Sequence, residues 1–355
     1  MSREFFRCTL CHHHCTIPPG GGGFCGVRKA ADSGELSLPF YGYITAAAVD
    51  PIEKKPLYHF RPGSRVLSLG FAGCNLRCPF CQNWHISQLQ AGPPPPGRRM
   101  DPEEILSTLP PESGSRQIAY TYSEPLIHFE YLKDCMELAH ERGIANVLVS
   151  NGCMNLEKAE EILPLIDAAN IDLKCFSGTN YRNILGGDLE TVLNFIRGAC
   201  RYGVCLELTT LVVPGFNDSD AELDRCAEFI AALEIEPVRR GSCGNREKAT
   251  TFPVPWHLSA YHPSYRWDAP PTGSAVLLRA AERARRILPY VYAGNIAGEE
   301  NSTLCPRCGA ALVRRRGYHV DIPLLTLPSG SLPPDIPGPR PCHCTSCDAE
   351  VPVYW

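Results

Sequence analysis

Three cysteines, Cys74, Cys78 and Cys81, follow an apolar run in the segment GFAGCNLRCPFCQNW. Their C-x3-C-x2-C spacing supplies three thiolates and no obvious fourth ligand. A structural zinc site takes four protein ligands, whereas a [4Fe–4S] cluster held by three cysteines leaves one iron free to bind another molecule. The array therefore predicts an iron–sulfur cluster with an open position; a zinc knuckle completed by a distant His or Cys is the alternative.

An open iron of this kind can chelate the amino and carboxylate groups of S-adenosylmethionine (SAM). Electron transfer into the sulfonium then releases a 5′-deoxyadenosyl radical, which is chemistry that belongs to the cofactor pair. The array lies after the first predicted strand of a βα series, and in both respects it resembles the signature of radical SAM enzymes. This resemblance implies a [4Fe–4S] cluster and SAM as cofactors.

A second group of cysteines lies near the end of the sequence. Two C-x2-C pairs, separated by about 35 residues, have the spacing of zinc-ribbon knuckles; they are Cys305, Cys308, Cys344 and Cys347. Cys342 is a spare thiol that could compete for the metal, but knuckle spacing favours Cys344. We therefore expect a closed, structural zinc site.

A third group lies near the start, in the pattern C-x2-C-x3-C-x9-C formed by Cys8, Cys11, Cys15 and Cys25. This tetrad predicts a metal site, for which zinc is favoured and a second iron–sulfur cluster that supplies electrons is the alternative. Three adjacent histidines at positions 12–14 lie among these cysteines and could replace one as a ligand. Because they cannot all point inward, we expect them to be exposed to solvent.

The composition of the chain argues against several classes of function. The chain has 355 residues, 19 of them Cys, and a net charge of −4. It contains no apolar run long enough to span a membrane and no signal-peptide pattern, so we expect a cytoplasmic protein. The acidic balance makes nucleic-acid binding unlikely to be its role. Seven cysteines outside the three groups are expected to be small buried hydrophobes.

Short β-branched runs alternate with helical patterns between residues 66 and 293, which is typical of βα units. The predicted strands are 66–71, 117–121, 146–149, 170–174, 205–213 and 256–261, and the predicted helices are 101–109, 126–142, 156–166, 189–201, 221–233 and 274–288. Six units predict an α/β fold, a partial (β/α)6 TIM-like barrel. We expect a Cys-rich N-terminal module at 1–50, a core at 51–298 and a zinc-ribbon-like module at 299–355, with a loop at 237–253.

Polar residues follow several of these strands. Active sites of βα barrels form at the C-terminal ends of the strands, where the sequence places Glu124, Asn151, Asp172, Lys174 and His262. A carboxylate can bind the ammonium of SAM, a Lys or His its carboxylate, and an Asn the ribose hydroxyls. These five residues are therefore the predicted cofactor pocket; taken singly, each could equally be a turn or loop residue.

A more specific family resemblance extends over nearly the whole chain. The sequence of residues 49–90, followed in order by YTYSEP, NIDLKCF, TTLVVPGFND, YHPSYRW and YVYAGNI, resembles the AmmeMemoRadiSam branch of radical SAM enzymes, which is similar to pyruvate formate-lyase activating enzymes. This resemblance implies that Asn83 contacts SAM. It also implies a flavodoxin-type or ferredoxin-type electron donor and a Memo-like or Ammecr-like protein partner.

The sequence thus predicts an enzyme that cleaves SAM reductively and abstracts hydrogen from a protein or small-molecule substrate, with no catalytic side chains beyond the cluster ligands. Two alternatives remain open. One is a non-catalytic metal-binding adaptor, which would have no reason to carry charged groups at successive strand ends. The other is a true glycyl-radical-enzyme activase.

Overall fold

The computed structural model describes residues 5–89, 94–109, 116–235, 251–298, 300–327 and 340–355. Its centre is one eight-stranded sheet in the order β16-β15-β12-β11-β10-β9-β7-β6. All neighbours are parallel except β6 and β7, which are antiparallel. In sheet order the strands are Val291–Gly294, Trp256–Ala260, Cys205–Val212, Ala168–Asp172, Ala145–Ser150, Gln117–Thr121, Arg65–Gly70 and Ala46–Pro51. The edge strands β16 and β6 do not pair with each other, so the barrel is open.

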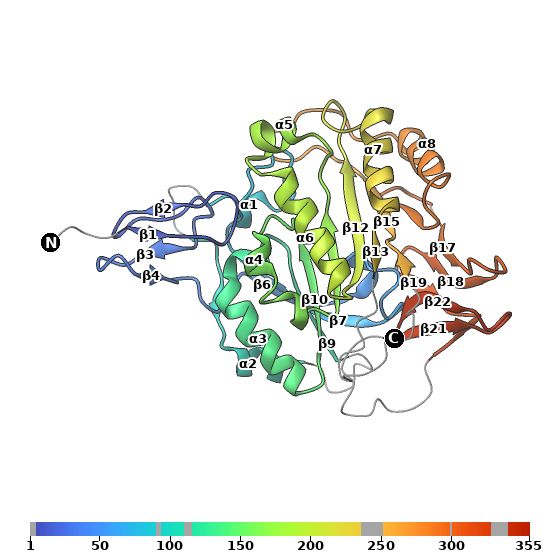
Figure 1. The fold of residues 1–355 in the computed structure, drawn as a ribbon, viewed down its shortest axis with the longest axis horizontal. Helices are drawn as coiled ribbons and strands as arrows, with labels where there is room; N and C mark the ends of the chain where they lie inside the picture. The colour runs from blue at the N-terminus through green and yellow to red at the C-terminus, as the bar shows by residue number, and fades with distance from the viewer. Residues whose placement is uncertain (1–4, 90–93, 110–115, 236–250, 299, 328–339) are drawn as a thin grey trace.

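Helices cover the outer face of this sheet (Figure 1). The α-helices are α1 (Trp84–Ser87), α2 (Pro102–Ser107), α3 (Phe129–Glu141), α4 (Leu156–Ala159), α5 (Gly178–Asn180), α6 (Leu189–Arg201), α7 (Asp220–Ala231) and α8 (Ser274–Ala284). The 3-10 helices are η1 (Ile52–Lys54), η2 (Pro125–His128) and η3 (Leu163–Leu165), and η4 (Tyr181–Leu185) is a π-helix. Asp188 and Ser219 cap α6 and α7 through side-chain bonds to free backbone N–H groups.

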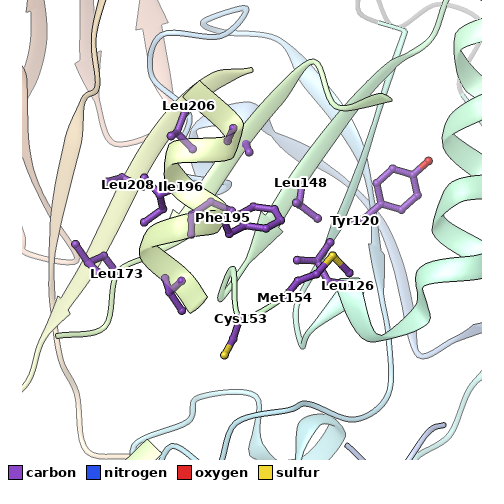
Figure 2. Close-up of a cluster of buried hydrophobic side chains, with 14 of the residues drawn as sticks. Tyr120, Leu126, Leu148, Cys153, Met154, Leu173, Phe195, Ile196, Leu206 and Leu208 are labelled. Atoms are coloured by element: carbon purple, nitrogen blue, oxygen red, sulfur yellow. The ribbon is translucent and has the colours of Figure 1, made fainter. Parts of the chain in front are cut away.

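The main core lies between the sheet and these helices. Figure 2 shows one part of it, where Phe195 and Ile196 of α6 pack against Leu148, Leu206 and Leu208 of the strands. Apolar side chains on both faces of the parallel strands explain their near-continuous hydrophobic runs. The predicted α/β class and six βα units are therefore present.

Two strands of the sheet were not predicted. Strand β16 has only four residues, and β6 is Ala-rich with three exposed residues at its start, so neither has a strong strand pattern. Because β6 belongs to the barrel sheet, the domain boundary expected after residue 50 falls inside this strand. Most of the loop expected at 237–253 lies outside the described residues; at its end, β14 (Phe252–Pro253) pairs with β13 (Glu234–Ile235).

Small antiparallel sheets form the two cysteine-rich modules, which lie on opposite sides of the barrel (Figure 1). The N-terminal strands are β1 (Phe6–Arg7), β2 (Thr16–Ile17), β3 (Lys29–Ala30) and β4 (Leu36–Ser37); β5 (Tyr43–Ile44) pairs with β8 (Arg98–Arg99). The C-terminal strands are β17 (Glu300–Leu304), β18 (Ala311–Arg316), β19 (His319–Asp321), β20 (Leu325–Thr326), β21 (Pro341–Cys344) and β22 (Glu350–Tyr354). Within the described part of the chain, no helix is long and apolar enough to cross a membrane.

The C-terminal module closes the base of the barrel, at the N-terminal ends of the parallel strands. The backbone N–H of Tyr354 donates to the carbonyl of His59 at 2.7 Å, and the side chain of Arg315 donates to Thr303 at 2.9 Å and to the Tyr58 carbonyl. Burial lowers the pKa of His59 to about 4, so its ring is neutral at physiological pH. Hydrogen bonds of buried groups therefore fix the module to the barrel.

Candidate active site

The three cysteines of the first motif lie in one loop, residues 74–81, directly after β7. We call it the cluster loop. Cys74 and Cys78 are buried and Cys81 is half-buried. The N–H of Leu76 donates to the Cys74 sulfur at 3.3 Å, and the Ser87 hydroxyl lies 3.3 Å from the sulfur of Cys81. The loop thus presents three sulfur atoms at the C-terminal edge of the sheet, where a barrel active site is expected.

The chemistry of these thiols fits a metal cluster. Burial raises the pKa of Cys78 to about 12, so the group needs a positively charged centre to become a thiolate. The described residues contain one group of three or more potential metal ligands whose atoms all lie within 4.8 Å of one another. This group is in the C-terminal module. The cluster-loop sulfurs are therefore spread more widely than the ligands of one ion, as expected for ligands to different irons of one cluster.

Glu124, at the end of β9, is joined to the cluster loop by a buried hydrogen-bond network. Its carboxyl oxygens accept from the Ser150 hydroxyl at 2.7 Å and from the Asn151 N–H at 2.8 Å. The Asn151 amide then donates to the Asn75 side chain at 3.0 Å and contacts the Cys74 sulfur at 3.6 Å. Burial outweighs these bonds and raises the pKa of Glu124 to about 7.

A charged pair lies at the end of β11, which is separated from β9 by β10 in the sheet. The Lys174 ammonium donates to the Asp172 carboxylate at 2.7 Å. Burial disfavours the charged form of Lys174, but the Asp172 carboxylate outweighs burial and raises the pKa of Lys174 above the ordinary value. Lys174 therefore remains protonated beside the cysteines, where it can bind an anionic group.

The two other predicted cofactor residues lie at the rim. Asn83 is half-buried and begins α1, where its carbonyl accepts from the Ile86 N–H at 3.1 Å. His262 is exposed, and its ring nitrogen lies 3.4 Å from the Asn295 carbonyl. The loop that carries His262 contacts the cluster loop through Ser264, whose hydroxyl donates to the Cys81 carbonyl at 3.1 Å. Any contact of Asn83 or His262 with SAM stays a prediction.

Comparison with known proteins gives the family. Residues 69–227, which include the cluster loop and four of the predicted pocket residues that follow it, match the model of the radical SAM superfamily. This segment is therefore a radical SAM domain. The match implies SAM and a [4Fe–4S] cluster as cofactors, for which the three cysteines after β7 are the fitting ligands.

Two relatives extend this result. The chain is 38% identical to an uncharacterized protein of Methanocaldococcus jannaschii, over 89% of each chain. It is 27% identical to the pyruvate formate-lyase-activating enzyme of Staphylococcus aureus, over 49% of this chain and 71% of the relative. A crystal structure of Streptococcus suis SuiB bound to S-adenosylmethionine aligns with a TM-score of 0.47 at 12% identity, over 66% of this chain and 52% of that one.

The C-terminal module contains the four-cysteine group predicted from the paired knuckles. The sulfurs of Cys305 and Cys347, and those of Cys308 and Cys344, lie 3.7 Å apart. Tetrahedral zinc, with Zn–S near 2.3 Å, separates its thiolates by about 3.8 Å, so the spacing fits one ion of this kind. Cys342 is buried outside the group, which leaves Cys344 as the ligand.

The expectation of exposed histidines was wrong for two of the three. His12 and His13 are half-buried, and only His14 is exposed. The His12 ring lies 3.0 Å from the Cys153 sulfur and the His13 ring 3.0 Å from the Asn75 carbonyl. The physical reason is tertiary packing, because the N-terminal module lies on the cluster loop and its His12 and His13 rings are covered at that contact.

Six of the seven isolated cysteines are buried, as predicted, and Cys243 lies outside the described residues. Cys153 differs from the other five because it contacts His12 of the N-terminal module, and Figure 2 shows its sulfur directed away from the apolar cluster. Sequence reasoning also missed Asn75 and Ser150. Asn75 stands next to Cys74 and Ser150 next to Asn151, and adjacency to a predicted site residue was the only available signal.

Proposed function

We propose that this protein reductively cleaves SAM and uses the resulting radical to abstract hydrogen from a protein or small-molecule substrate. One observation carries the proposal: the loop with three thiols is linked through Asn151 to a carboxyl group, Glu124, and lies near an ammonium group, Lys174. These charges are complementary to the ammonium and carboxylate of a methionyl group. A non-catalytic adaptor would not need either charge.

When bound, the cluster would supply one electron that breaks the C5′–S bond, giving methionine and a 5′-deoxyadenosyl radical that becomes 5′-deoxyadenosine by taking one hydrogen atom from the substrate. The chain's own residues would bind and orient the cofactor. Asn151, which lies 3.6 Å from the Cys74 sulfur, and Asn83 would act as polar contacts to SAM. The electron would come from a low-potential donor of the flavodoxin or ferredoxin type.

The substrate is the more open part of the proposal. Similarity to an activating enzyme favours a protein substrate, with hydrogen abstraction from a glycine as the first candidate. A Memo-like or Ammecr-like protein is the second candidate partner, on the resemblance described above. Deuterium transfer from labelled candidate proteins into 5′-deoxyadenosine would distinguish them.

The cleavage itself can be tested without a substrate. Anaerobically reconstituted protein is reduced in the presence of SAM, and 5′-deoxyadenosine is measured by mass spectrometry. We expect product from the parent protein and none from the variant with Cys74→Ala, Cys78→Ala and Cys81→Ala. Cys342→Ser is the matched control, because that thiol lies outside every predicted metal site. Undiminished product in the triple variant would refute the proposal.

A further inference from the structure

The N-terminal module packs directly against the cluster loop. The His13 ring nitrogen lies 3.0 Å from the backbone carbonyl oxygen of Asn75, and the guanidinium of Arg77 stacks 4.0 Å from the ring centre of Phe24. Asn75 and Arg77 lie between Cys74 and Cys78 in sequence. The two N-terminal segments that carry cysteines therefore contact the same short stretch that is expected to hold the radical SAM cluster.

This contact is close at the level of the backbone. Gly73, with φ of +82°, precedes Cys74, and a Cβ added there would lie 2.7 Å from the carbonyl oxygen of Cys25. A carbonyl cannot move aside as a flexible side chain can, so only glycine fits this position. The fixed approach of Cys25 to Gly73 shows that the N-terminal module occupies a defined position beside the cluster loop.

Three of the N-terminal thiols are near one another, but their sulfur atoms are not as close together as the ligands of a single zinc ion. Cys8, Cys11 and Cys25 are each at most 8% exposed, and charges on Cys8 and Cys25 would both act on Cys11. Yet within the described residues no three of these thiols lie within 4.8 Å of one another, unlike the four sulfurs of the C-terminal module. Their spacing is therefore wider than tetrahedral zinc requires, and in this respect they match the cluster-loop cysteines.

We propose that the N-terminal cysteines bind a second iron–sulfur cluster beside the radical SAM cluster; the ligands are Cys8, Cys11, Cys15 and Cys25. Four thiolates are a sufficient ligand set for such a cluster, and several irons accommodate the wider spacing. His13, two residues after Cys11, lies 3.0 Å from the carbonyl oxygen of Asn75, and Asn75 is covalently joined to Cys74, so one contact links the two cysteine segments. A one-electron donor protein could reduce the outer cluster, which would then pass the electron inward.

The site is tested by metal content in the full-length chain, reconstituted anaerobically with iron and sulfide. The variant with Cys74→Ala, Cys78→Ala and Cys81→Ala should retain about half of the parent's iron and sulfide, and reduction should give an electron paramagnetic resonance signal. Adding Cys11→Ser and Cys25→Ser should remove the remaining iron. Retention of one zinc equivalent in the C-terminal module and an unchanged circular dichroism spectrum check that each variant is folded.

A second set of variants controls for misfolding of the combined variant. Cys11→Ser and Cys25→Ser alone should lose about half of the iron, whereas Cys200→Ala, which removes an isolated buried thiol, should lose none. Absence of iron from the cluster-loop variant would overturn the proposal, and so would a second zinc equivalent in its place. Because the readout is metal content, the proposal can fail while SAM cleavage succeeds, or succeed while SAM cleavage fails.

Discussion

Replacing Glu124 by Gln separates an observed role of one carboxyl group from a proposed one. This group accepts hydrogen bonds from Ser150, Asn151 and Leu126 and so holds the end of β10. We propose that it also binds the ammonium of SAM. The second role requires the ionised form, and burial raises the pKa of Glu124 from 4.5 to about 7.

The expected size of the effect follows from that pKa. About a tenth of the Glu124 carboxyl groups are ionised near pH 6 and about three quarters near pH 7.5, so the affinity for SAM should rise roughly eightfold over this interval. Above this range the α-amino group of SAM itself loses its proton. The charge-assisted bond contributes about 1.5–3 kcal/mol, so Glu124→Gln should weaken binding by roughly ten- to a hundredfold and remove the pH dependence.

The assay is titration of SAM against the reduced cluster, followed by electron paramagnetic resonance near both pH values. Glu157→Gln, at an exposed position on α4, is the matched control and should behave like the parent protein. The parent's affinity could prove independent of pH while Glu124→Gln binds equally tightly. In that case Glu124 only holds the Asn151 turn, and the assignment to the cofactor pocket is refuted.

The same pKa has a consequence for stability. Because the folded-state pKa of Glu124 lies above its ordinary value of 4.5, the folded protein holds more protons than the unfolded chain between about pH 4.5 and 7. This group therefore lowers the free energy of unfolding as pH rises through that window. Glu124→Gln should remove this group's contribution to the pH dependence of the free energy of unfolding, which denaturant titrations at several pH values would measure.

Three further predictions concern the rest of the molecule. Lys174→Met should weaken SAM affinity by roughly ten- to a hundredfold in the same titration, because the cation that would pair with the SAM carboxylate is lost. Unchanged affinity would exclude Lys174 from the pocket, and loss of iron would assign it to the cluster site instead. Cys344→Ser should lose about one zinc equivalent and lower the melting temperature, whereas Cys342→Ser should retain the metal; the reverse result would exchange the two ligands. Arg315→Met should lower the free energy of unfolding by about 3–5 kcal/mol, because it leaves the buried Glu53, 3.9 Å away, without its cation; a cost below about 1 kcal/mol would show that the pair contributes little.

The sequence was sufficient for six of the seven parallel strands because their signal is local. Residues 117–121, predicted as a strand, are those of β9, and all five are buried. The helix predicted at 126–142 stops before Gly143, which has φ of +64° and comes two residues after the end of α3. Strand β6 was missed because it is stabilised by pairing with β7 rather than by its own pattern, since it begins with three exposed alanines.

The site was predictable only in part, for a similar reason. Glu124 and Asn151 could be found because strand ends converge on one edge of a parallel sheet. The link from Asn151 to Asn75 spans 76 positions, and no local pattern encodes it. The position of His12 against Cys153 depends on docking between segments 141 residues apart. Long-range contacts of this kind require the folded chain.

The closure of the barrel base by the C-terminal module also bears on how the protein is made. His59 contacts Pro352, 293 positions later, so the ribosome must synthesise almost the whole chain before this end of the barrel can close. Until then, the apolar residues that Tyr354 covers, Phe60 and Phe252 among them, are open to wrong contacts. Since metal binding and folding are coupled in small cysteine modules, zinc shortage in a growing cell should cause newly made chains to aggregate, although the proposed iron sites lie at the opposite end of the barrel.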